Sequence, residues 1–275
     1  MFLVLQLTKD TYFCDMQQFV SYKNIEIAYT VSGQGNVLIF LHGFLETSTM
    51  WQPYIDIFSK THKVIAIDLL GHGKTPCLGY IHTMEEMAET VFAVVKELKL
   101  RKMHLFGHSM GGYVALAFAE MYPDYLKGLC LINSTSRADT DERKVNRDRA
   151  IRAVKHNHKQ FIRISITNLF RPKNRKIFTQ KIKEVKKEAL TTSLQGIVAA
   201  MEGMKIREDR EVLLHFSPYK KMMIIGKHDP VLNFEDLLDQ TKNSEVDVDI
   251  FPDGHMSHIE NKEDLLFSLE KFVRN

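Results

Sequence analysis

The stretch Leu105-Phe106-Gly107-His108-Ser109-Met110-Gly111-Gly112 decides how the rest of the chain is interpreted. An apolar run at 103–106 precedes Ser109 and is typical of a short buried strand, and the apolar run at 110–121 is typical of a helix. The pattern therefore predicts a sharp strand-to-helix turn with Ser109 at its tip. A serine in such a turn has a strained backbone and an outward hydroxyl. The glycines two positions before and after it allow strand and helix to pack closely.

Apolar runs and helical patterns alternate along the chain on both sides of this stretch. We predict strands at 18–22, 25–31, 37–41, 63–67, 103–106, 126–132, 221–225 and 246–251. We predict helices at 50–60, 84–98, 110–121, 235–241 and 262–273. This alternation indicates an α/β fold with a mostly parallel central sheet and helices on both faces. Ligands bind at the carboxyl ends of the strands in such sheets.

Residues 136–210 interrupt this alternation with a basic, helical segment. Residues 137–210 hold 20 Lys and Arg against 9 Asp and Glu, a balance of +11 in a chain whose formal net charge is +3. Helical spacing appears at 145–155, 177–190 and 194–204, and apolar residues also recur at helical spacing from 161 to 170. The basic residues either form a solvated face or favour a substrate that carries a carboxylate or phosphate. Interleaved acidic residues argue against nucleic acid.

Length and composition agree with a soluble globular chain. The 275 residues are 44% hydrophobic and 26% charged, which suits one large α/β domain or a core with an insertion. The three cysteines, Cys14, Cys77 and Cys130, have no disulfide or metal spacing, so a reducing, cytoplasmic compartment is expected. Residues 1–16 are interpreted as an N-terminal extension without a signal peptide or membrane span, and Met16 is an alternative start.

Three chemically complementary residues follow predicted strands in the order Ser109, Asp229, His255. A serine hydroxyl needs a base to take its proton, and that base needs a group that fixes its tautomer. The carboxyl ends of parallel strands share one edge of a sheet, so these side chains are expected to meet there.

Other assignments of these residues stay open. Ser109 could be an ordinary helix N-cap, and Asp229 an ordinary turn residue before Pro230. The carboxylate could instead come from Asp139 or Asp141, after the preceding strand. His258, three residues further on, competes with His255 as the base.

Five stretches together resemble the α/β-hydrolase fold family: Leu-His-Gly-Phe at 41–44, Asp-Leu-Leu-Gly-His-Gly at 68–73, Gly-His-Ser-Met-Gly-Gly at 107–112, Gly-Lys-His-Asp-Pro at 226–230 and Gly-His at 254–255. The resemblance implies that residues 17–135 and 211–275 form the core and that 136–210 form an inserted helical lid. It also implies site roles: Ser109 as nucleophile, His255 as general base and then acid, Asp229 as the orienting carboxylate, and the backbone N–H groups of Phe44 and Met110 as the oxyanion hole.

The activity that the resemblance implies is acyl transfer to Ser109 from a small carboxylic ester, lactone or thioester, without a cofactor or a metal. A carbon–carbon bond hydrolase, a lyase like that of the menaquinone pathway, and a slow-turnover ligand sensor are the alternatives. The lyases carry an arginine where this chain has Tyr113, and a serine nucleophile disfavours the dehalogenase and epoxide hydrolase branches. Candidates for the substrate pocket are His42, Trp51, His108 and Tyr113. The oligomeric state, monomer or dimer, is left open.

Overall fold

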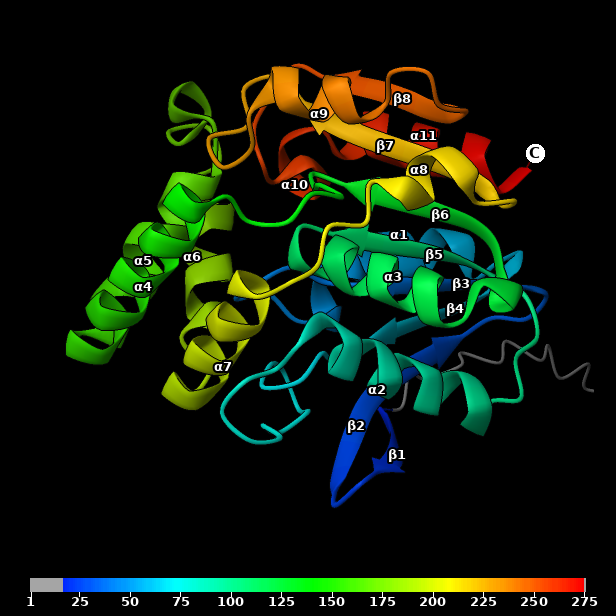
Figure 1. Ribbon diagram of the computed structural model, residues 1–275, viewed down its shortest axis with the longest axis horizontal. Coiled ribbons are helices and arrows are strands. Elements are labelled where there is room, and N and C mark those ends of the chain that lie inside the picture. The colour runs from blue at the N-terminus through cyan, green and yellow to red at the C-terminus, as the bar shows by residue number, and fades with distance from the viewer. Residues whose placement is uncertain (1–16, 275) are drawn as a thin grey trace, which may run out of the picture.

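An eight-stranded sheet forms the centre of the protein (Figure 1). The computed structural model describes residues 17–274, so the extension expected at 1–16 lies outside the described residues. The sheet order is β1-β2-β4-β3-β5-β6-β7-β8. The strands are β1 Gln18–Tyr22, β2 Ile25–Ser32, β3 Asn36–Leu41, β4 His62–Ile67, β5 Met103–His108, β6 Leu126–Ile132, β7 Lys220–Gly226 and β8 Val246–Phe251.

The sheet is parallel from β4 to β8, and β1 and β2 form an antiparallel edge. Its central strands are apolar on both faces, because helices cover both. In β3, for example, Leu38 and Phe40 pack into one core, and Ile39 and Leu41 pack into the other. The predicted mostly parallel α/β sheet is confirmed.

Two helical layers enclose the sheet. The helices α2 Met84–Glu97, α3 Met110–Met121 and α9 Phe234–Gln240 contribute to the larger core, on one face. The helices α1 Gln52–Phe58 and α11 Lys262–Arg274 contribute to the smaller core, on the other face. The helix expected at 50–60 is shorter than expected: a 3-10 turn at Ser48–Trp51 precedes α1, with a proline in the first turn of α1.

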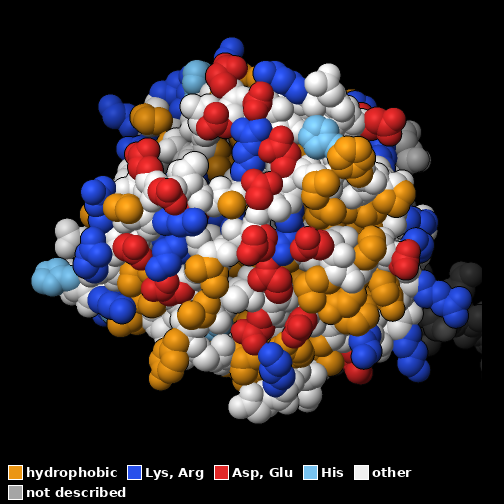
Figure 2. Space-filling model, in the orientation of Figure 1, with side chains coloured by type: hydrophobic (Ala, Val, Ile, Leu, Met, Phe, Trp, Pro, Cys, Tyr) orange, Lys and Arg blue, Asp and Glu red, His pale blue; other side chains and the backbone are white. Residues whose placement is uncertain are grey.

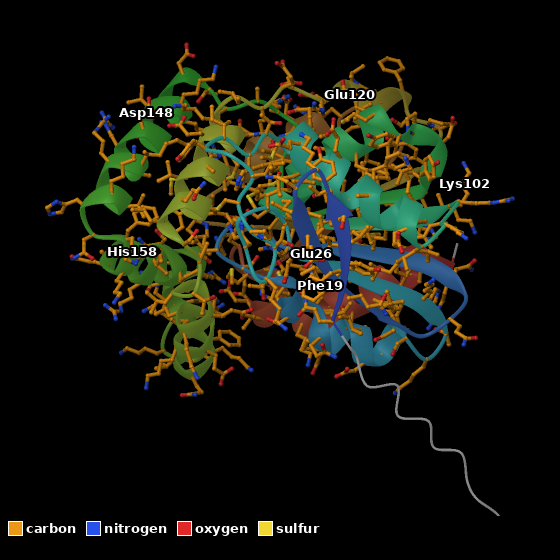
Figure 3. All side chains as sticks on the ribbon, turned by 90° about the horizontal axis from the view of Figure 1, so that it is seen from below. Phe19, Glu26, Lys102, Glu120, Asp148 and His158 are labelled. Carbon is orange, nitrogen blue, oxygen red and sulfur yellow. The ribbon has the colours of Figure 1, made fainter. Side chains whose placement is uncertain are left out.

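Four further helices gather at one side of the sheet (Figure 1): α4 Asp141–His156, α5 His158–Leu169, α6 Thr179–Ala189 and α7 Leu194–Lys205. In the view from below, Asp148 of α4 and His158 of α5 lie on the opposite side from Lys102, which precedes β5 (Figure 3). These helices therefore lie toward the carboxyl ends of the strands. The two ends of the segment meet where the Arg210 N–H donates to the Ser136 carbonyl at 2.8 Å.

Two short helices have no counterpart in the sequence prediction, α8 Val212–Phe216 and α10 Ser257–Glu260. Segments of four or five residues are too short to carry a helical period. Basic and acidic side chains are interleaved on the face in view in Figure 2, including the part over α4 to α7. Among residues 17–274, no helix is long and apolar enough to cross a bilayer.

Candidate active site

Ser109 occupies a strained turn between β5 and α3. Its backbone lies at φ 50° and ψ −114°, a region that non-glycine residues rarely adopt. The Ser109 N–H donates to the Ile132 carbonyl at 2.9 Å, and the Ser134 hydroxyl donates to the Ser109 carbonyl at 2.8 Å. The Ser109 hydroxyl is directed to His255 rather than capping α3, which argues against an ordinary N-cap.

Close packing of the strand against the helix maintains this turn. A Cβ atom on Gly107 would lie 2.3 Å from the Gly111 carbonyl oxygen. A Cβ atom on Gly111 would lie 2.5 Å from the Leu41 carbonyl oxygen, on the neighbouring strand. Both contacts are with backbone atoms that side-chain rotation cannot relieve, so the positions flanking Ser109 require glycine.

A continuous hydrogen-bond chain joins Ser109, His255 and Asp229. His255 Nε2 lies 2.8 Å from Ser109 Oγ, and His255 Nδ1 lies 2.7 Å from Asp229 Oδ2. The other Asp229 oxygen accepts the N–H groups of Val231 at 2.8 Å and Leu232 at 3.1 Å. Burial alone would raise the pKa of Asp229, but the charge and hydrogen bond of His255 and these N–H groups lower it. Asp229 is therefore a buried, ionised partner for His255.

The competing candidates lie elsewhere. His258 is buried and faces Glu46, with its Nε2 3.4 Å from Glu46 Oε1. Burial lowers the pKa of His258 to about 3 despite the nearby Glu46 carboxylate. Asp139 pairs with arginines of α4, and Asp141 is fully exposed in the first turn of α4. The geometry thus brings Asp229 and His255, and not these residues, to Ser109.

Glu46 and His108 form a buried ion pair behind the three aligned residues. Glu46 Oε2 lies 2.7 Å from His108 Nδ1 and also accepts the Gly43 N–H at 2.9 Å. His108 Nε2 lies 2.9 Å from the His255 carbonyl oxygen and donates to it. Burial alone would raise the pKa of Glu46. The charge and hydrogen bond of His108, with smaller effects of the other nearby histidines, outweigh burial and lower the pKa of Glu46 to about 2. Burial lowers the pKa of His108, but Glu46 outweighs this effect and raises it. Both ring nitrogens of His108 face oxygen acceptors, an arrangement that suits the protonated ring beside an ionised Glu46.

Sequence reasoning missed Glu46 entirely. The residue stands two positions after the stretch at 41–44 that carried the family resemblance, yet nothing in a single sequence marks it as buried. Its ligand-type atoms, with those of His108 and His258, all lie within 4.8 Å of one another. A cation there would have to replace the 2.7 Å bond between Glu46 and His108. Glu46 lies in the loop after β3, His108 ends β5 and His258 lies in α10, so no metal-ligand spacing was visible in the sequence.

The expected oxyanion donors lie beside Ser109. Met110 is the first residue of α3, and the N–H groups of a first helical turn point away from the helix body. Phe44 follows β3 and lines the same cavity as Ser109. The Glu46 carboxylate holds the preceding residue, Gly43, by its N–H. This arrangement can place two backbone N–H groups near one oxygen atom bound at Ser109.

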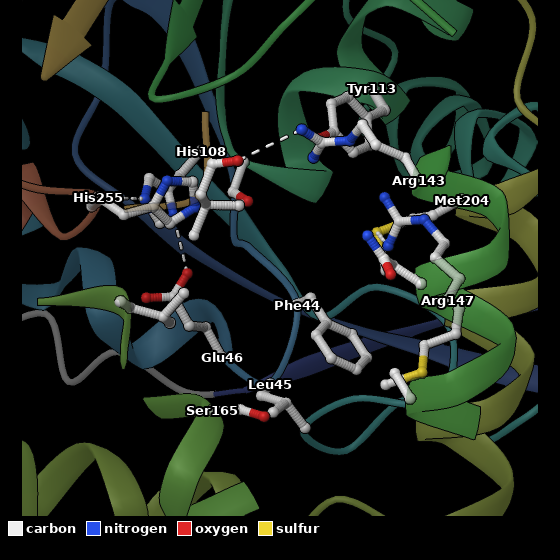
Figure 4. A pocket seen from close by; sticks show the side chains of 16 residues that line it. Phe44, Leu45, Glu46, His108, Tyr113, Arg143, Arg147, Ser165, Met204 and His255 are labelled. Carbon is white, nitrogen blue, oxygen red and sulfur yellow. Dashed lines mark hydrogen bonds and ion pairs between the residues drawn. The ribbon is translucent and has the colours of Figure 1, made fainter. Parts of the chain in front are cut away.

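A cavity of about 360 Å³ opens beside Ser109 (Figure 4). His108 and Tyr113, two of the expected pocket residues, line it together with His255. Its walls also include residues of α4, α5 and α7, so helices of the 136–210 segment enclose it. The apolar residues that these helices contribute to the cavity are Ala150, Leu169, Met201 and Met204.

The expectation that His42 and Trp51 lie in the pocket is corrected by their positions. Trp51 is fully buried in the smaller core, with its ring 5.0 Å from that of Phe40. His42 Nδ1 donates to the Gly43 carbonyl at 2.8 Å, and His42 Nε2 accepts the Leu69 N–H at 2.9 Å. Neither side chain lines the cavity. His42 instead joins the loop that carries Phe44 to Leu69, and Trp51 packs against Phe40 and Tyr54 in the core.

Comparison with known proteins agrees with this architecture. A family model described as the alpha/beta hydrolase fold matches residues 36–262. The chain belongs to the α/β-hydrolase fold family. The fold, the enzyme class and the family resemblance predicted from the sequence are thereby confirmed.

Solved structures and a curated relative add detail to this family assignment. A malate-bound esterase from Thermogutta terrifontis is 28% identical, has a TM-score of 0.85 and covers 94% of this chain and 98% of its own. The enol-lactonase of Burkholderia xenovorans LB400 shares the fold at 18% identity, with a TM-score of 0.86 and coverage of 94% and 100%. An (E)-2-((N-methylformamido)methylene)succinate hydrolase from Acinetobacter baylyi is 28% identical over 130 residues, which are 47% of this chain and 49% of that protein. That match thus spans about half the length of the curated relative.

Proposed function

We propose that this α/β-hydrolase cleaves a small carboxylic ester, lactone or thioester by way of an acyl-enzyme on Ser109. The observation that carries the proposal is the hydrogen-bond chain from Ser109 Oγ through His255 to the buried, ionised Asp229. A serine hydroxyl with a base 2.8 Å away in a small cavity is positioned for nucleophilic attack. The esterase from Thermogutta terrifontis, at 28% identity over most of both chains, supports the same reaction class.

In the proposed reaction His255 Nε2 takes the proton of the Ser109 hydroxyl as Oγ attacks the carbonyl carbon. The carbonyl oxygen becomes an oxyanion and accepts hydrogen bonds from the N–H groups of Phe44 and Met110. Each of these bonds stabilises the transition state by roughly 3–4 kcal/mol. The tetrahedral intermediate collapses as His255 gives its proton to the leaving alcohol or thiol. Water then attacks the acyl-enzyme as His255 takes its proton, and His255 returns that proton to Ser109 Oγ as the acid leaves. Asp229 holds the His255 tautomer and stabilises its cation throughout.

The remaining alternatives are ranked by particular residues. Tyr113, in place of an arginine, disfavours the lyase reaction, and no described contact favours carbon–carbon bond hydrolysis over ester hydrolysis. A slow-turnover ligand sensor on this fold can keep the same aligned serine and base, so measured ester turnover separates it from a hydrolase. We retain residues 136–210 as a proposed lid, and the cytoplasm as the proposed compartment, since Cys77 and Cys130 are free thiols.

Labelling by a fluorophosphonate, followed by peptide mapping, tests whether Ser109 is activated. We expect one labelled peptide containing Ser109, with turnover of at least one member of a p-nitrophenyl ester series from acetate to octanoate. Ser109→Ala should abolish both labelling and turnover while the protein stays folded by circular dichroism. Labelling of another serine, or turnover near background for every ester, would contradict the proposal.

A further inference from the structure

Asp139 lies at the root of α4 and pairs with three arginines. Its side chain is 0% exposed, with one oxygen 2.6 Å from Arg207 Nη1 and 3.2 Å from Arg143 Nε. The other oxygen pairs with Arg147 Nε. None of the three guanidinium groups pairs with a second carboxylate within the part of the chain that the structure describes. Three positive charges therefore share one negative charge.

Arg207 is the most deeply buried arginine of this group. Its side chain is 3% exposed, and its guanidinium stacks on the Tyr113 ring at 4.1 Å from the centroid. It also donates to the carbonyl oxygens of Met204 and Arg137, both at 2.9 Å. The Arg207–Asp139 pair is thus a balanced, buried unit behind Tyr113, which leaves the charges of the other two arginines without compensation.

Arg143 and Arg147 carry these two charges into the cavity beside Ser109. They stand four residues apart on one face of α4, line the cavity and are 34% and 17% exposed. Arg143 Nη1 donates to the Val231 carbonyl at 3.3 Å, and Arg147 Nη1 meets only the sulfur of Met204 at 3.6 Å among its described partners. Thioether sulfur is a weak acceptor. Figure 4 shows the two arginines facing His108 and His255 across the cavity.

The sum of the charges around the cavity indicates which charge on a ligand would complement the site. The arginine group around Asp139 has a net charge of +2, the Glu46–His108 pair is balanced, and Asp229 contributes −1. The cavity is therefore left with +1. A monoanion neutralises this charge, whereas a phosphate dianion would reverse it.

We infer that Arg143 and Arg147 bind a carboxylate on the substrate, within the cavity that opens beside Ser109. The inference rests on the proposed function and names its substrate class. Guanidinium groups bind carboxylates in a two-point geometry. Apolar side chains such as Met201 and Leu169 line the cavity as well, so the part of the substrate between the ester and the carboxylate is a short hydrocarbon chain. The preferred substrate is thus a half-ester of a short dicarboxylic acid, with one free carboxylate.

Two esters that differ only in charge test this assignment: mono-4-nitrophenyl adipate, which has a free carboxylate, and methyl 4-nitrophenyl adipate, which is neutral. We expect the wild-type kcat/KM to be higher for the anionic ester by about 10- to 100-fold, as for a hydrogen bond to a charged group. Arg147→Gln should remove most of this preference by raising KM for the anionic ester far more than KM for the neutral ester. Asp139 keeps two arginines in that variant, so it should stay folded, which a melting curve checks.

Arg152→Gln is the matched control, because it removes the same charge from an exposed position on the same helix. It should leave the preference for the anionic ester intact. Equal wild-type kcat/KM for the two esters, or an equal loss in Arg147→Gln and Arg152→Gln, would overturn the inference.

A binding measurement separates failure of the inference from failure of the proposed function. Ser109→Ala cannot turn over, so calorimetry with monomethyl adipate reports binding alone. Tighter binding of monomethyl adipate than of dimethyl adipate, lost in the Ser109→Ala/Arg147→Gln double variant, is expected even if neither nitrophenyl ester is hydrolysed. Tighter binding of monobutyl phosphate than of monomethyl adipate would overturn the assignment to a carboxylate.

Discussion

Replacing Glu46 by glutamine probes the buried ion pair that connects three parts of the active site. The substitution keeps the shape of the side chain and removes its charge. Glu46 and His108 have side chains that are 3% and 1% exposed, so water cannot replace the lost partner. The carboxylate accepts from both the Gly43 N–H and His108, and protonated His108 donates to the His255 carbonyl.

No arrangement of the glutamine amide satisfies all of these bonds. In one arrangement the amide oxygen accepts from the Gly43 N–H and from neutral His108. The other His108 nitrogen then has no proton, and its lone pair faces the oxygen of the His255 carbonyl. In the other arrangement the amide nitrogen faces Gly43 and His108. Its N–H groups then face the Gly43 N–H, so two donors meet without an acceptor. Breaking one side of a buried pair costs about 3–5 kcal/mol. For a domain of this size, a loss of about 3 kcal/mol corresponds to a decrease in Tm of about 5 °C.

The stability difference between wild type and Glu46→Gln should depend on pH. The pKa of Glu46 is lowered, so its contribution is complete above its ordinary value of 4.5 and is lost as the pH falls through about 2. The pKa of His108 is raised, so its contribution is complete below its ordinary value of 6.5 and is lost as the pH rises through the folded-state pKa. The difference should therefore be largest between pH 4.5 and 6.5.

Urea unfolding at a series of pH values measures this difference directly, and ester kinetics on the same samples report the site. We expect kcat/KM to fall by about 10- to 100-fold, because displacement of the His255 backbone by a fraction of an ångström misaligns the base. Glu184→Gln is the control, since it removes an exposed carboxylate paired with Lys181 and should leave both measurements unchanged. A Glu46→Gln protein as stable as wild type at pH 6 would refute the reasoning.

Other substitutions separate the roles of the remaining site residues. His255→Ala should eliminate nearly all ester turnover, whereas His258→Ala should retain much of it at a lower Tm; the opposite ranking in a p-nitrophenyl assay would reassign the base. Asp229→Asn should lower kcat by about 10⁴-fold with the fold preserved, because an amide stabilises the wrong imidazole tautomer; near-normal kcat would exclude Asp229 as the orienting group. Gly111→Ala should lose about 3 kcal/mol in urea unfolding, because its Cβ would lie 2.5 Å from the Leu41 carbonyl oxygen, and unchanged stability would show that the strand and helix can separate.

The sheet and the three aligned residues could be predicted because both follow from local patterns. Apolar runs bounded by turns identify parallel strands, and Ser109, Asp229 and His255 each stand just after such a run. Parallel strands bring these ends to one edge, so sequence position alone was enough to place the residues close together.

The other residues around the site could not be predicted, because their positions depend on which side of a loop or helix faces inward. The loop after β3 turns Trp51 into the core on the opposite face of the sheet and buries Glu46 beside His108. In α4, charged residues lie on every side, so no apolar stripe distinguishes the inward Arg143 and Arg147 from their exposed neighbours. Only the packing of α4 over the cavity makes that distinction.

The distribution of the aligned residues over the sheet limits when the protein can act. Ser109 follows β5 near the centre of the sheet, Asp229 follows β7, and His255 follows β8 at the edge. Strands β7 and β8 follow the long helical segment in the chain, and parallel pairing over such separations forms slowly. During synthesis the residues of the serine turn therefore emerge from the ribosome long before His255, the proposed base. Under the proposed mechanism a chain without docked β8 carries an inert serine, so recovery of activity during refolding should report the final docking of β8 rather than the collapse of the core.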